Sequence, residues 1–395
     1  MDQKVLKGLR ILDFTWVLAG PYATRILGDF GAEVIKIQSK KTAKGAESNL
    51  TGYFNHWNRN KRSITLDMNY PEAREIFLKL IKISDVVIEN FSPRVMSNWG
   101  LDYERLKGVR SDLIMVSVST MGQDGTWKDY VAYGPTLHAL SGLTYLTSYN
   151  KDSPMGLGYA YADFISGLYA AFATLSALEY REKTGQSQYI DLSEYEAICT
   201  LLGPTFLDIS QNHKQVLPYG NRSNYLSAAP YGCYKCLGTD RWCVIAVFNG
   251  EEWQSLCHIL GHPDWTKDEK FSTLSKRQEN AEELDGLLTH WTIQHPPEEV
   301  VDLLQEAGIS AGVVQSAEDL ARDPQLLARD FFIQLEHPTI GRTISDRSPI
   351  RFADDLTVGW KAGPVLGEDN RYVFIELLGL TEGEFSSLIE KGVIG

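Results

Sequence analysis

The feature that most constrains the fold is an alternation of short apolar runs with longer amphipathic segments over the first 120 residues. The segments LRILDF, EVIKI, SDVVIENF and DLIMVSVS have the length and composition of buried strands. GPYATRILGDFG and EAREIFLKLIKI have the apolar spacing of helices, the first entered through Gly20 and Pro21 and closed by Gly28 or Gly31. Strands that alternate with helices predict an α/β fold, with a Rossmann-like, mostly parallel sheet and helices on both faces.

A long apolar segment then runs from Asp163 to Gly185, with no further charge before Glu179. It predicts one helix that ends at Gly185, with Arg181 and Lys183 in its last turn, where cations offset the helix dipole. The strand QYIDLS and the helix EYEAICTLLGPTF are expected to follow.

The pattern changes after Gly220. APYGCYKCLGTDRWCVIAVF predicts a hairpin that turns near Gly238, followed by the helices EEWQSLCHILG, RQENAEELDGLLTHWTI and EEVVDLLQEAG and the strand SAGVVQS. From Phe331 the chain is expected to return to the first domain and to end in the helix RYVFIELLGL. We therefore predict a large Rossmann-like domain of residues 1–218 and 331–395, and a smaller α+β domain of residues 219–330.

Composition limits the classes of function. The formal charge of −13 argues against a general nucleic-acid binder, which needs a basic face. No secretory signal is evident, and the apolar run after Asp163 is too short and too rich in small polar residues for a membrane span. Five cysteines, an odd number, suit free thiols in a reducing compartment. We expect a cytoplasmic protein with no membrane or nucleic-acid partner.

Asp163 has two compatible interpretations. The simpler one is an N-cap of the long helix, whose replacement by alanine costs about 1 kcal/mol. The other is a nucleophile, because a carboxylate that faces the positive end of a helix keeps its charge when partly desolvated. Gly156, Gly158, Ala160 and Gly167 are small, so they leave room for a ligand or for close helix packing.

Other motifs carry less information. Arg59, Lys61 and Arg62 form one cationic cluster, and KIQSKKTAKG forms another; each is either solvated surface or a phosphate site for a ligand such as a nucleotide or coenzyme A (CoA). WVLAGP is not a dinucleotide fingerprint, and no P-loop or GxSxG serine is present. His138 is expected to face the core. Cys233 and Cys236 lack the two further ligands that a structural zinc requires, so no metal is expected.

Taken together, these residues resemble the family III CoA-transferases, a group that includes formyl-CoA transferase and carnitine-related CoA-transferases. The resemblance runs nearly end to end and is specific through the order and spacing of its motifs: LKGLRILDFTWVLAGPYATRILGDFGAEVIKI, NRNKRSITLDM, DVVIENFSPRVMSNWGLDY, REKTGQSQYIDLS, GNRS, APYGCYKC, RDFFIQLEHPTIG and GPVLGEDN. It implies that the large domain binds CoA, and that two chains form an interlocked homodimer or that the chain pairs with a paralogous subunit.

The resemblance places Asp163 on the catalytic aspartate of the family. It implies attack of this carboxylate on a donor acyl-CoA, a mixed anhydride, an aspartyl-CoA thioester, and then the reverse steps with an acceptor carboxylic acid. Such a cycle needs no metal and no tightly bound cofactor, since CoA and acyl-CoA are substrates. It needs a site poor in water, which Tyr159, Tyr161 and Phe164 suit, and backbone N–H groups at the helix start are expected to stabilise the oxyanions.

The resemblance also implies a set of substrate and CoA contacts. Val17 and Leu18 lie near the reacting end, although Leu18 replaces the glutamine of formyl-CoA transferase. Ser39, Asn69, Asn98 and Val131 stand where that enzyme has basic residues, so nearby cations, including Lys128, are expected to substitute. The full set is Val17, Leu18, Ala19, Lys40, Lys61, Arg62, Asn90, Phe91, Arg94 and Tyr133.

The chain is also similar to the branch that exchanges CoA between succinyl-CoA and aryl-substituted succinates, and its aromatic residues agree with a bulky acceptor. No glycine-rich loop follows VFNGEEW, which argues against an oxalate-type substrate. Two alternatives remain. One is a 2-methylacyl-CoA racemase, whose proton-transfer histidine is replaced here by Tyr133, a poor proton acceptor near neutral pH. The other is a non-catalytic CoA-binding subunit of a hetero-oligomeric transferase.

Overall fold

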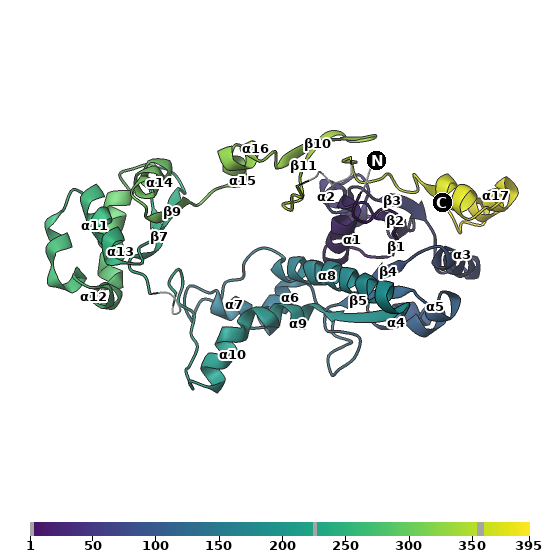
Figure 1. Cartoon of the computed structure of the whole chain (residues 1–395), viewed down its shortest axis with the longest axis horizontal. Helices are drawn as coiled ribbons and strands as arrows, with labels where there is room; N and C mark the ends of the chain where they lie inside the picture. The colour runs from purple at the N-terminus through teal and green to yellow at the C-terminus, as the bar shows by residue number, and fades with distance from the viewer. Residues whose placement is uncertain (1–3, 224–226, 354–358) are drawn as a thin grey trace. The chain divides into compact units, whose positions relative to one another are not determined.

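The computed structural model describes residues 4–223, 227–353 and 359–395 (Figure 1). The chain divides into two compact units. The first comprises Met1–Thr144, Gly156–Gln215 and Leu327–Gly395, and the second comprises Tyr145–Met155 and Val216–Leu326.

The first unit is built on a six-stranded parallel sheet, the helices that connect its strands, and a separate antiparallel pair of strands. Its strands are β1 (Arg10–Asp13), β2 (Glu33–Gln38), β3 (Arg62–Thr65), β4 (Val86–Glu89), β5 (Ile114–Ser119), β6 (Gln188–Ser193), β10 (Phe332–His337) and β11 (Gly341–Asp346). Its helices are α1 (Ala19–Asp29), α2 (Gly52–Asn58), α3 (Pro71–Lys82), α4 (Arg94–Asn98), α5 (Tyr103–Val109), α6 (Gly134–Leu140), α8 (Tyr161–Thr184), α9 (Glu194–Cys199), α10 (Gly203–Ser210) and α17 (Glu382–Glu390). A π-helical segment covers Tyr372–Leu377, and α7 (Leu143–Leu146) and α16 (Pro324–Ala328) lie where the units meet along the chain.

The first six strands form one parallel sheet in the order β3-β2-β1-β4-β5-β6. The predicted Rossmann-like α/β fold is thus confirmed. The strand β3 was not predicted, because only Ile64 of its four residues is apolar, whereas at least half of the residues in the equally short β1 and β4 are apolar. The connections change direction between β1 and β4, and in open α/β sheets ligands bind outside the carboxyl ends of the strands at such a switch point.

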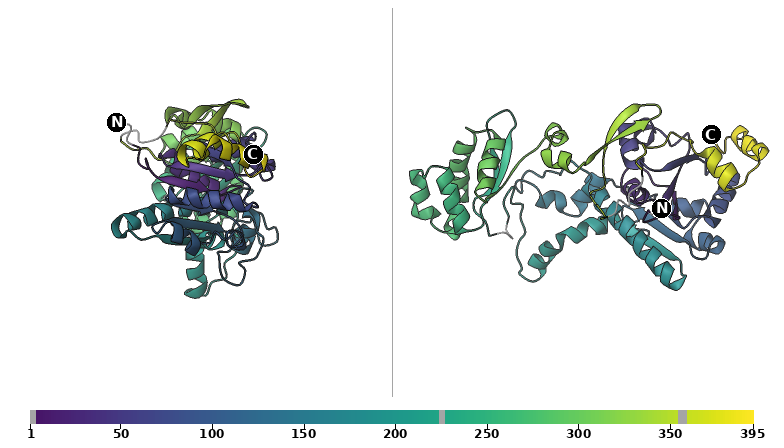
Figure 2. Two further views of the ribbon diagram at one scale, coloured as in Figure 1. Left: turned by 90° about the vertical axis from the view of Figure 1, so that its right-hand side faces the viewer. Right: turned by 45° about the horizontal axis from the view of Figure 1, so that its top comes forward.

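Side chains that alternate along the strands build two separate cores. Ile11, Val34 and Val86 pack with α1 and α8, whereas Leu12 and Ile35 pack with α3 and with the C-terminal segment that contains α17. Figures 1 and 2 show these helices on the two faces of the sheet. A sheet buried on both faces has strands that are apolar throughout, which is why they were recognisable from sequence.

Helix α8 crosses α1 at close range. A Cβ atom on Gly167 would lie 2.7 Å from the Ala19 carbonyl oxygen and 2.9 Å from the Tyr22 ring, so only glycine permits this approach. The helix ends at Gly185 (φ 70°), as predicted. Within the described residues, α8 alone has the length and apolar composition of a membrane span. Its small residues nevertheless pack on α1 and on the sheet, so α8 is a helix of the folded unit.

The segment after β6 differs from the prediction. EYEAICTLLGPTF was expected to be one helix, but α9 ends at Cys199 and α10 begins at Gly203, with a short 3₁₀ turn between them. Pro204 lies in the first turn of α10, where its missing N–H is tolerated, and the same residue would break a continuous helix.

The second unit contains β7 (Tyr231–Lys235), β8 (Trp242–Ala246) and β9 (Ser310–Val313), paired antiparallel in that order. Its helices, seen beside these strands in Figure 2, are α11 (Gly250–Ile259), α12 (Leu274–Glu279), α13 (Ala281–Thr292), α14 (Pro297–Glu306) and α15 (Ala317–Ala321). The predicted hairpin is present, with Gly238 at φ 114° in its turn. The helix predicted over RQENAEELDGLLTHWTI is divided at Asn280 into α12 and α13.

Candidate active site

A small pocket lies at the switch point of the sheet. Its volume is about 130 Å³, and its walls come from the loop after β1, the carboxyl ends of β4 and β5, the loop 128–133, and the first turns of α8 and α9. Asp163 and Glu194 both line it. The pocket therefore occupies the position where the fold is expected to receive a ligand.

Asp163 does not cap its helix. Ala160 is the N-cap residue of α8, so Asp163 lies in the first turn instead, and the N-cap interpretation was wrong. The carboxylate oxygen Oδ2 is buried without a hydrogen-bond partner. Burial raises the pKa of Asp163 to about 6, although its own N–H opposes the shift. A buried polar atom without a partner is rare in folded proteins, and its presence here suits a group that a ligand contacts.

Helix α6 approaches this carboxylate through a glycine. A Cβ atom on Gly134 would lie 2.8 Å from Asp163 Oδ2 and 3.3 Å from Cα of Ala160. The first residue of α6 thus forms a wall directly against the carboxyl group. Any side chain at this position would compete with Asp163 for space.

The N–H groups at the start of α8 already have partners. The N–H of Tyr161 donates to the Tyr159 carbonyl (2.8 Å), that of Asp163 donates to the Ala160 carbonyl (3.1 Å), and that of Ala162 donates to Nε2 of His138 (3.1 Å). The expectation that these groups stabilise oxyanions is therefore wrong in this structure.

His138 is buried, as expected, and burial lowers the pKa of its imidazole. A neutral imidazole can accept the hydrogen bond from the Ala162 N–H. His138 thus fixes the start of α8, and its accepting nitrogen is not directed to a substrate.

Ser119 supplies a hydroxyl that has no partner. It is the last residue of β5, it lines the pocket, and its Oγ is buried without a hydrogen bond. The pocket therefore holds an unpaired donor in addition to the unpaired acceptor of Asp163. A thioester carbonyl oxygen requires such a donor.

The loop after β1 is held in a strained conformation. Val17 has φ 62°, which is unusual for a β-branched residue, and its N–H donates to the carboxylate of buried Glu47 (2.7 Å). The side chain of Asn90 bonds both backbone groups of Trp16, accepting at 2.8 Å and donating at 2.9 Å. The ring of Phe91 packs against aromatic residues of the adjacent core. Asn90 and Phe91 therefore fix the pocket wall, and the strain at Val17 is typical of a functional loop.

Several predicted contacts gather around Asp163 and others do not. Val17, Asn90, Phe91 and Tyr133 line its pocket. Leu18 and Ala19 follow directly and are buried at the start of α1. Arg94 begins α4 beyond the pocket and pairs with Asp129 (2.8 Å) while both remain exposed. Lys40 is exposed after β2, beside the C-terminal Gly395, and does not line the pocket.

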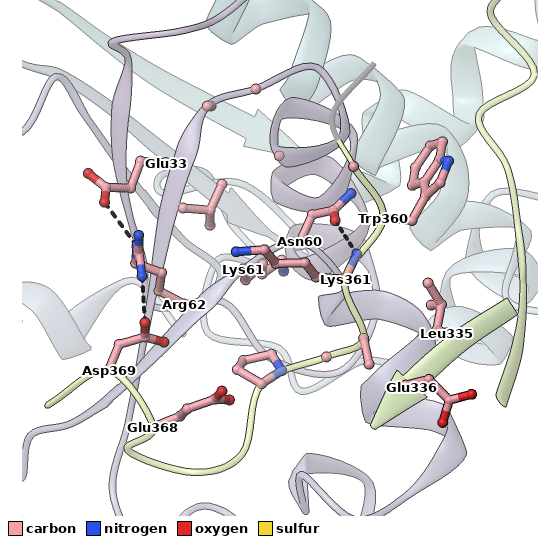
Figure 3. Close-up of a pocket in the computed structure, with 18 of the residues that line it drawn as sticks. Glu33, Asn60, Lys61, Arg62, Leu335, Glu336, Trp360, Lys361, Glu368 and Asp369 are labelled. Carbon is pink, nitrogen blue, oxygen red and sulfur yellow. Dashed lines mark hydrogen bonds and ion pairs between the residues drawn. The ribbon is translucent and has the colours of Figure 1, made fainter. Parts of the chain in front are cut away.

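Lys61 and Arg62 do not line the pocket that contains Asp163. The ammonium group of Lys61 is fully buried and bonds Asp13 (3.0 Å), and burial lowers its pKa to about 7. Arg62 pairs with Glu33 (2.9 Å) and with Asp369 (2.6 Å). Both residues line a larger cavity of about 730 Å³ at the amino ends of β2 and β3 (Figure 3). Their charges are neutralised within the fold, which corrects the expectation that this cluster binds phosphate.

Arg59, the third cation of that cluster, is also internal. It is fully buried and bonds Asp29 (2.6 Å) and Asp346 (2.9 Å). Asp346 ends β11, so this ion pair joins the returning C-terminal segment to the first helices. A buried arginine with two carboxylate partners has a structural role.

Two residues of the pocket, Glu194 and Ser119, were not predicted as site residues. Glu194 follows β6 directly, and Ser119 ends β5. Burial and the nearby charge of Asp163 raise the pKa of Glu194 to about 8. A usable signal existed, because polar residues that end parallel strands gather at one edge of the sheet.

A Rossmann-like sheet with a polar pocket at its switch point defines an α/β protein that binds a ligand at the carboxyl edge of its strands. The family model of CoA-transferase family III matches residues 6–370, and the chain belongs to this family of enzymes. No group of three or more histidine, cysteine, aspartate or glutamate side chains in the described part of the chain is arranged to hold a metal ion.

Relatives cover the whole chain. The succinyl-CoA–D-citramalate CoA-transferase of Chloroflexus aurantiacus is 30% identical over 98% of this chain and 98% of its own. The succinyl-CoA:glutarate CoA-transferase of Mus musculus is 32% identical over 100% of this chain and 91% of its own. Among solved structures, a CaiB/BaiF family protein from Brucella suis matches with a TM-score of 0.86 and 31% identity, over 95% of this chain and 100% of that one.

Proposed function

We propose that the protein moves CoA from a donor acyl-CoA to a carboxylic acid, with Asp163 as the nucleophile. The observation that carries the proposal is the buried Oδ2 of Asp163, which has no partner and lines the pocket at the switch point. A carboxylate nucleophile must be desolvated and yet accessible to the acyl carbon.

The cycle consists of four acyl transfers. Asp163 attacks the donor thioester carbonyl, and the C–S bond breaks to give a mixed anhydride and the CoA thiolate. The thiolate attacks the aspartyl carbonyl, releasing the donor carboxylate and leaving an aspartyl-CoA thioester. An acceptor carboxylate then attacks this thioester, and the released thiolate attacks the acceptor carbonyl of the new anhydride. Asp163 is regenerated without net proton uptake and without loss of the thioester bond.

Three features of the surroundings of Asp163 support this chemistry. The Ser119 hydroxyl has no partner and would donate to the developing oxyanion. Phe164, beside Asp163, stacks on Tyr159 at 5.0 Å and packs edge-on against Trp57 at 5.4 Å, and such aromatic packing limits water. The close wall at Gly134 leaves little room for a hydrolytic water.

The pocket volume supports a division of the ligand between the pocket and the surface around it. A pocket of about 130 Å³ can hold only the reacting end of an acyl-CoA. Pockets that enclose a whole small-molecule ligand have volumes of roughly 300–1,000 Å³. The nucleotide then lies outside the pocket, along the exposed surface. Lys128 lines the pocket wall, and Lys40 and Arg94 are exposed beyond the ends of β2 and β4, so these three cations are the proposed phosphate contacts.

For substrates, we propose succinyl-CoA as the donor and an aryl-substituted succinate as the acceptor. The donor is supported by two relatives whose names specify succinyl-CoA. The acceptor is supported by aromatic side chains on the pocket wall, namely Trp16, Tyr130 and Tyr133. No histidine lines the pocket within the described residues, so nothing there favours the racemase alternative.

The test is to trap the covalent intermediate. The wild-type protein, incubated with succinyl-CoA and no acceptor, should yield a hydroxamate on Asp163 after hydroxylamine treatment, located by peptide mass spectrometry. Asp163→Asn should abolish this adduct and lower kcat by a factor on the order of 10⁴, because the nucleophile is lost while its shape is kept. The exposed Asp124→Asn is the matched control and should retain both.

Two results would overturn the proposal. One is a wild-type rate of transfer in Asp163→Asn. The other is an isolated chain that binds acyl-CoA but forms neither adduct nor product, which would favour a non-catalytic subunit.

A further inference from the structure

We propose that Glu194 is a positioning residue of the transfer reaction, which holds a proton beside Asp163 and thereby keeps the negative charge of the pair on the nucleophile. This inference rests on the proposed role of Asp163. It concerns a side chain that lies in the same pocket but has no part in the four acyl transfers.

The fold brings Glu194 and Asp163 into the wall of the same small pocket. Glu194 is the first residue of α9, directly after β6, and its N-cap Ser193 accepts from the Glu196 N–H (3.2 Å). Helix α9 packs against α8 and α6. The Glu194 side chain is 6% exposed, yet it lines the same small pocket as Asp163.

The groups around Glu194 do not stabilise a charge on it. Helix α8 contributes the carboxylate of Asp163, which lines the same pocket. The titratable residue of α6 is His138, whose Nε2 already accepts from the Ala162 N–H. The loop 128–133 contributes exposed Lys128 with the phenols Tyr130 and Tyr133. Within the described residues, no hydrogen bond or ion pair reaches the Glu194 carboxyl group.

Two carboxyl groups that line one small, largely buried pocket cannot both ionise readily, so the pair retains one proton. The proton belongs on Glu194. Burial and the Asp163 charge both raise the pKa of Glu194, and nothing lowers it, whereas the N–H of Asp163 favours the ionised form of that residue. Tyr53 also stays neutral, because burial and the Asp163 charge raise its pKa to about 12.

The arrangement affects every step of the cycle. In each transfer a thiolate or a carboxylate attacks a carbonyl carbon. That carbon belongs either to the side chain of Asp163 or to the bound acyl group. A neutral Glu194 leaves that approach unopposed. An ionised Glu194 would place a second negative charge in a water-poor pocket, where like charges repel strongly. Ionisation of Glu194 should therefore stop turnover, although no step consumes its proton.

The experiment is the pH profile of kcat/KM for succinyl-CoA between about pH 4 and about pH 10. In the wild type, activity should fall on the alkaline side, by about tenfold one pH unit above the midpoint, since only about a tenth of Glu194 is then protonated. Glu194→Gln is isosteric and permanently neutral, so it should lose the alkaline fall and keep the acidic one. Exposed Glu196, on the same helix, is the matched control, and Glu196→Gln should retain both.

An infrared titration of the protonated carboxyl band tests the same point without the glutamine variant. In Asp163→Asn the neighbouring charge is absent, so the Glu194 band should disappear at a lower pH than in the wild type. Glu89 is also buried with a raised pKa, but Asp163 is not among the causes, so its band should not move.

The inference is overturned if Glu194→Gln and wild type have superimposable pH profiles, or if the carboxyl bands titrate identically with and without Asp163. Trapping the adduct separates this failure from failure of the proposed function. An Asp163 adduct in both proteins together with identical profiles removes only the role of Glu194. A wild-type protein that forms no adduct on Asp163 removes the nucleophile itself.

Discussion

The unpaired carboxylate of Asp163 lowers the stability of the folded chain, because a charge moved from water into a pocket without a partner loses its hydration. The chain keeps this group where its atoms are constrained from several sides. His138 holds the helix that carries it, and Gly134 closes one side of the carboxyl group. At the residue scale, the site requires that position 134 has no side chain as much as it requires the carboxylate of Asp163.

Gly134→Ala should lower activity more than stability. The added methyl group would lie 2.8 Å from Asp163 Oδ2, and the carboxyl group must rotate away to accommodate it. Displacement of a reacting group by about 1 Å can cost on the order of 100-fold in rate. We expect kcat/KM to fall by a factor on the order of 10 to 100, measured by steady-state transfer from succinyl-CoA, with a small change in Tm.

Gly108→Ala is the control for this substitution. Gly108 lies in α5, and an added Cβ would meet no atom within 4 Å. Activity should be unchanged there. Equal rates in Gly134→Ala and wild type would show that the carboxyl group has more freedom than the geometry indicates.

At the scale of elements, the crossing of α1 and α8 determines where Asp163 lies relative to the loop after β1. Helix α1 begins directly after the strained Val17, and α8 begins just before Asp163. The two helices meet at Gly167, one turn beyond Asp163. This close approach holds the start of α8 against the start of α1.

Gly167→Ala should destabilise the first unit. The new Cβ would lie 2.7 Å from the backbone carbonyl of Ala19, which cannot rotate away as a side chain can, so the helices must separate. Overpacking of this kind costs about 1–3 kcal/mol. We expect this loss in the free energy of unfolding by chemical denaturation, together with a lower rate of transfer.

The control is Gly383→Ala, in the first turn of α17, where an added Cβ meets no atom within 4 Å. That substitution should leave stability unchanged or raise it by up to about 1 kcal/mol, because alanine favours helix. If Gly167→Ala were as stable as Gly383→Ala, the close crossing would not be a constraint.

At the scale of the whole molecule, the helices α8 and α10 of the first unit expose several large apolar side chains to solvent. Phe172 on α8 is 68% exposed, and α10 has no buried residue, with Phe206 and Leu207 exposed. Exposed apolar patches of this kind mark association surfaces. We propose that a second copy of the chain covers them, in agreement with the interlocked dimer that the family resemblance implies.

Phe172→Glu should weaken this association. A charge placed in an apolar interface loses its hydration, and loss of a central aromatic contact costs on the order of 2 kcal/mol or more in binding. Sedimentation velocity at micromolar concentration should show a dimer for the wild type and an increased monomer fraction for the variant. Ile389→Glu, at an exposed position of α17, is the control and should remain dimeric. A monomeric wild type, or an undisturbed Phe172→Glu dimer, would contradict the proposal.

The fold was largely predictable from the sequence. Strands that are buried on both faces are rich in Val and Ile, and helices often end at a glycine such as Gly185. Both features can therefore be recognised from short stretches of sequence. The strand β3, the hairpin of β10 and β11, the final helix α17 and the break between α9 and α10 were not predicted. Strand β3 has one apolar residue in four, and the break at Pro204 lies within an otherwise apolar segment.

The site was predictable only in part. The family resemblance selected Asp163, and Val17, Asn90, Phe91 and Tyr133 share its pocket. Lys61 and Arg62 were expected at the same ligand, but their partners Asp13, Glu33 and Asp369 lie far away in sequence. Whether a cation is free or neutralised depends on which residues the fold brings beside it.

The sequence by itself determined the α/β class, the position of the long helix and the residue at its head, because hydrophobic periodicity and turn-forming residues act over short distances. Only the tertiary structure decided that Glu194 and Ser119 lie beside Asp163, and that the N–H groups of the helix start are already used. The residues concerned lie on three different elements: Ser119 at the end of β5, Asp163 in the first turn of α8, and Glu194 at the start of α9. These relations follow from the order of the parallel strands within the sheet, which local sequence patterns do not determine.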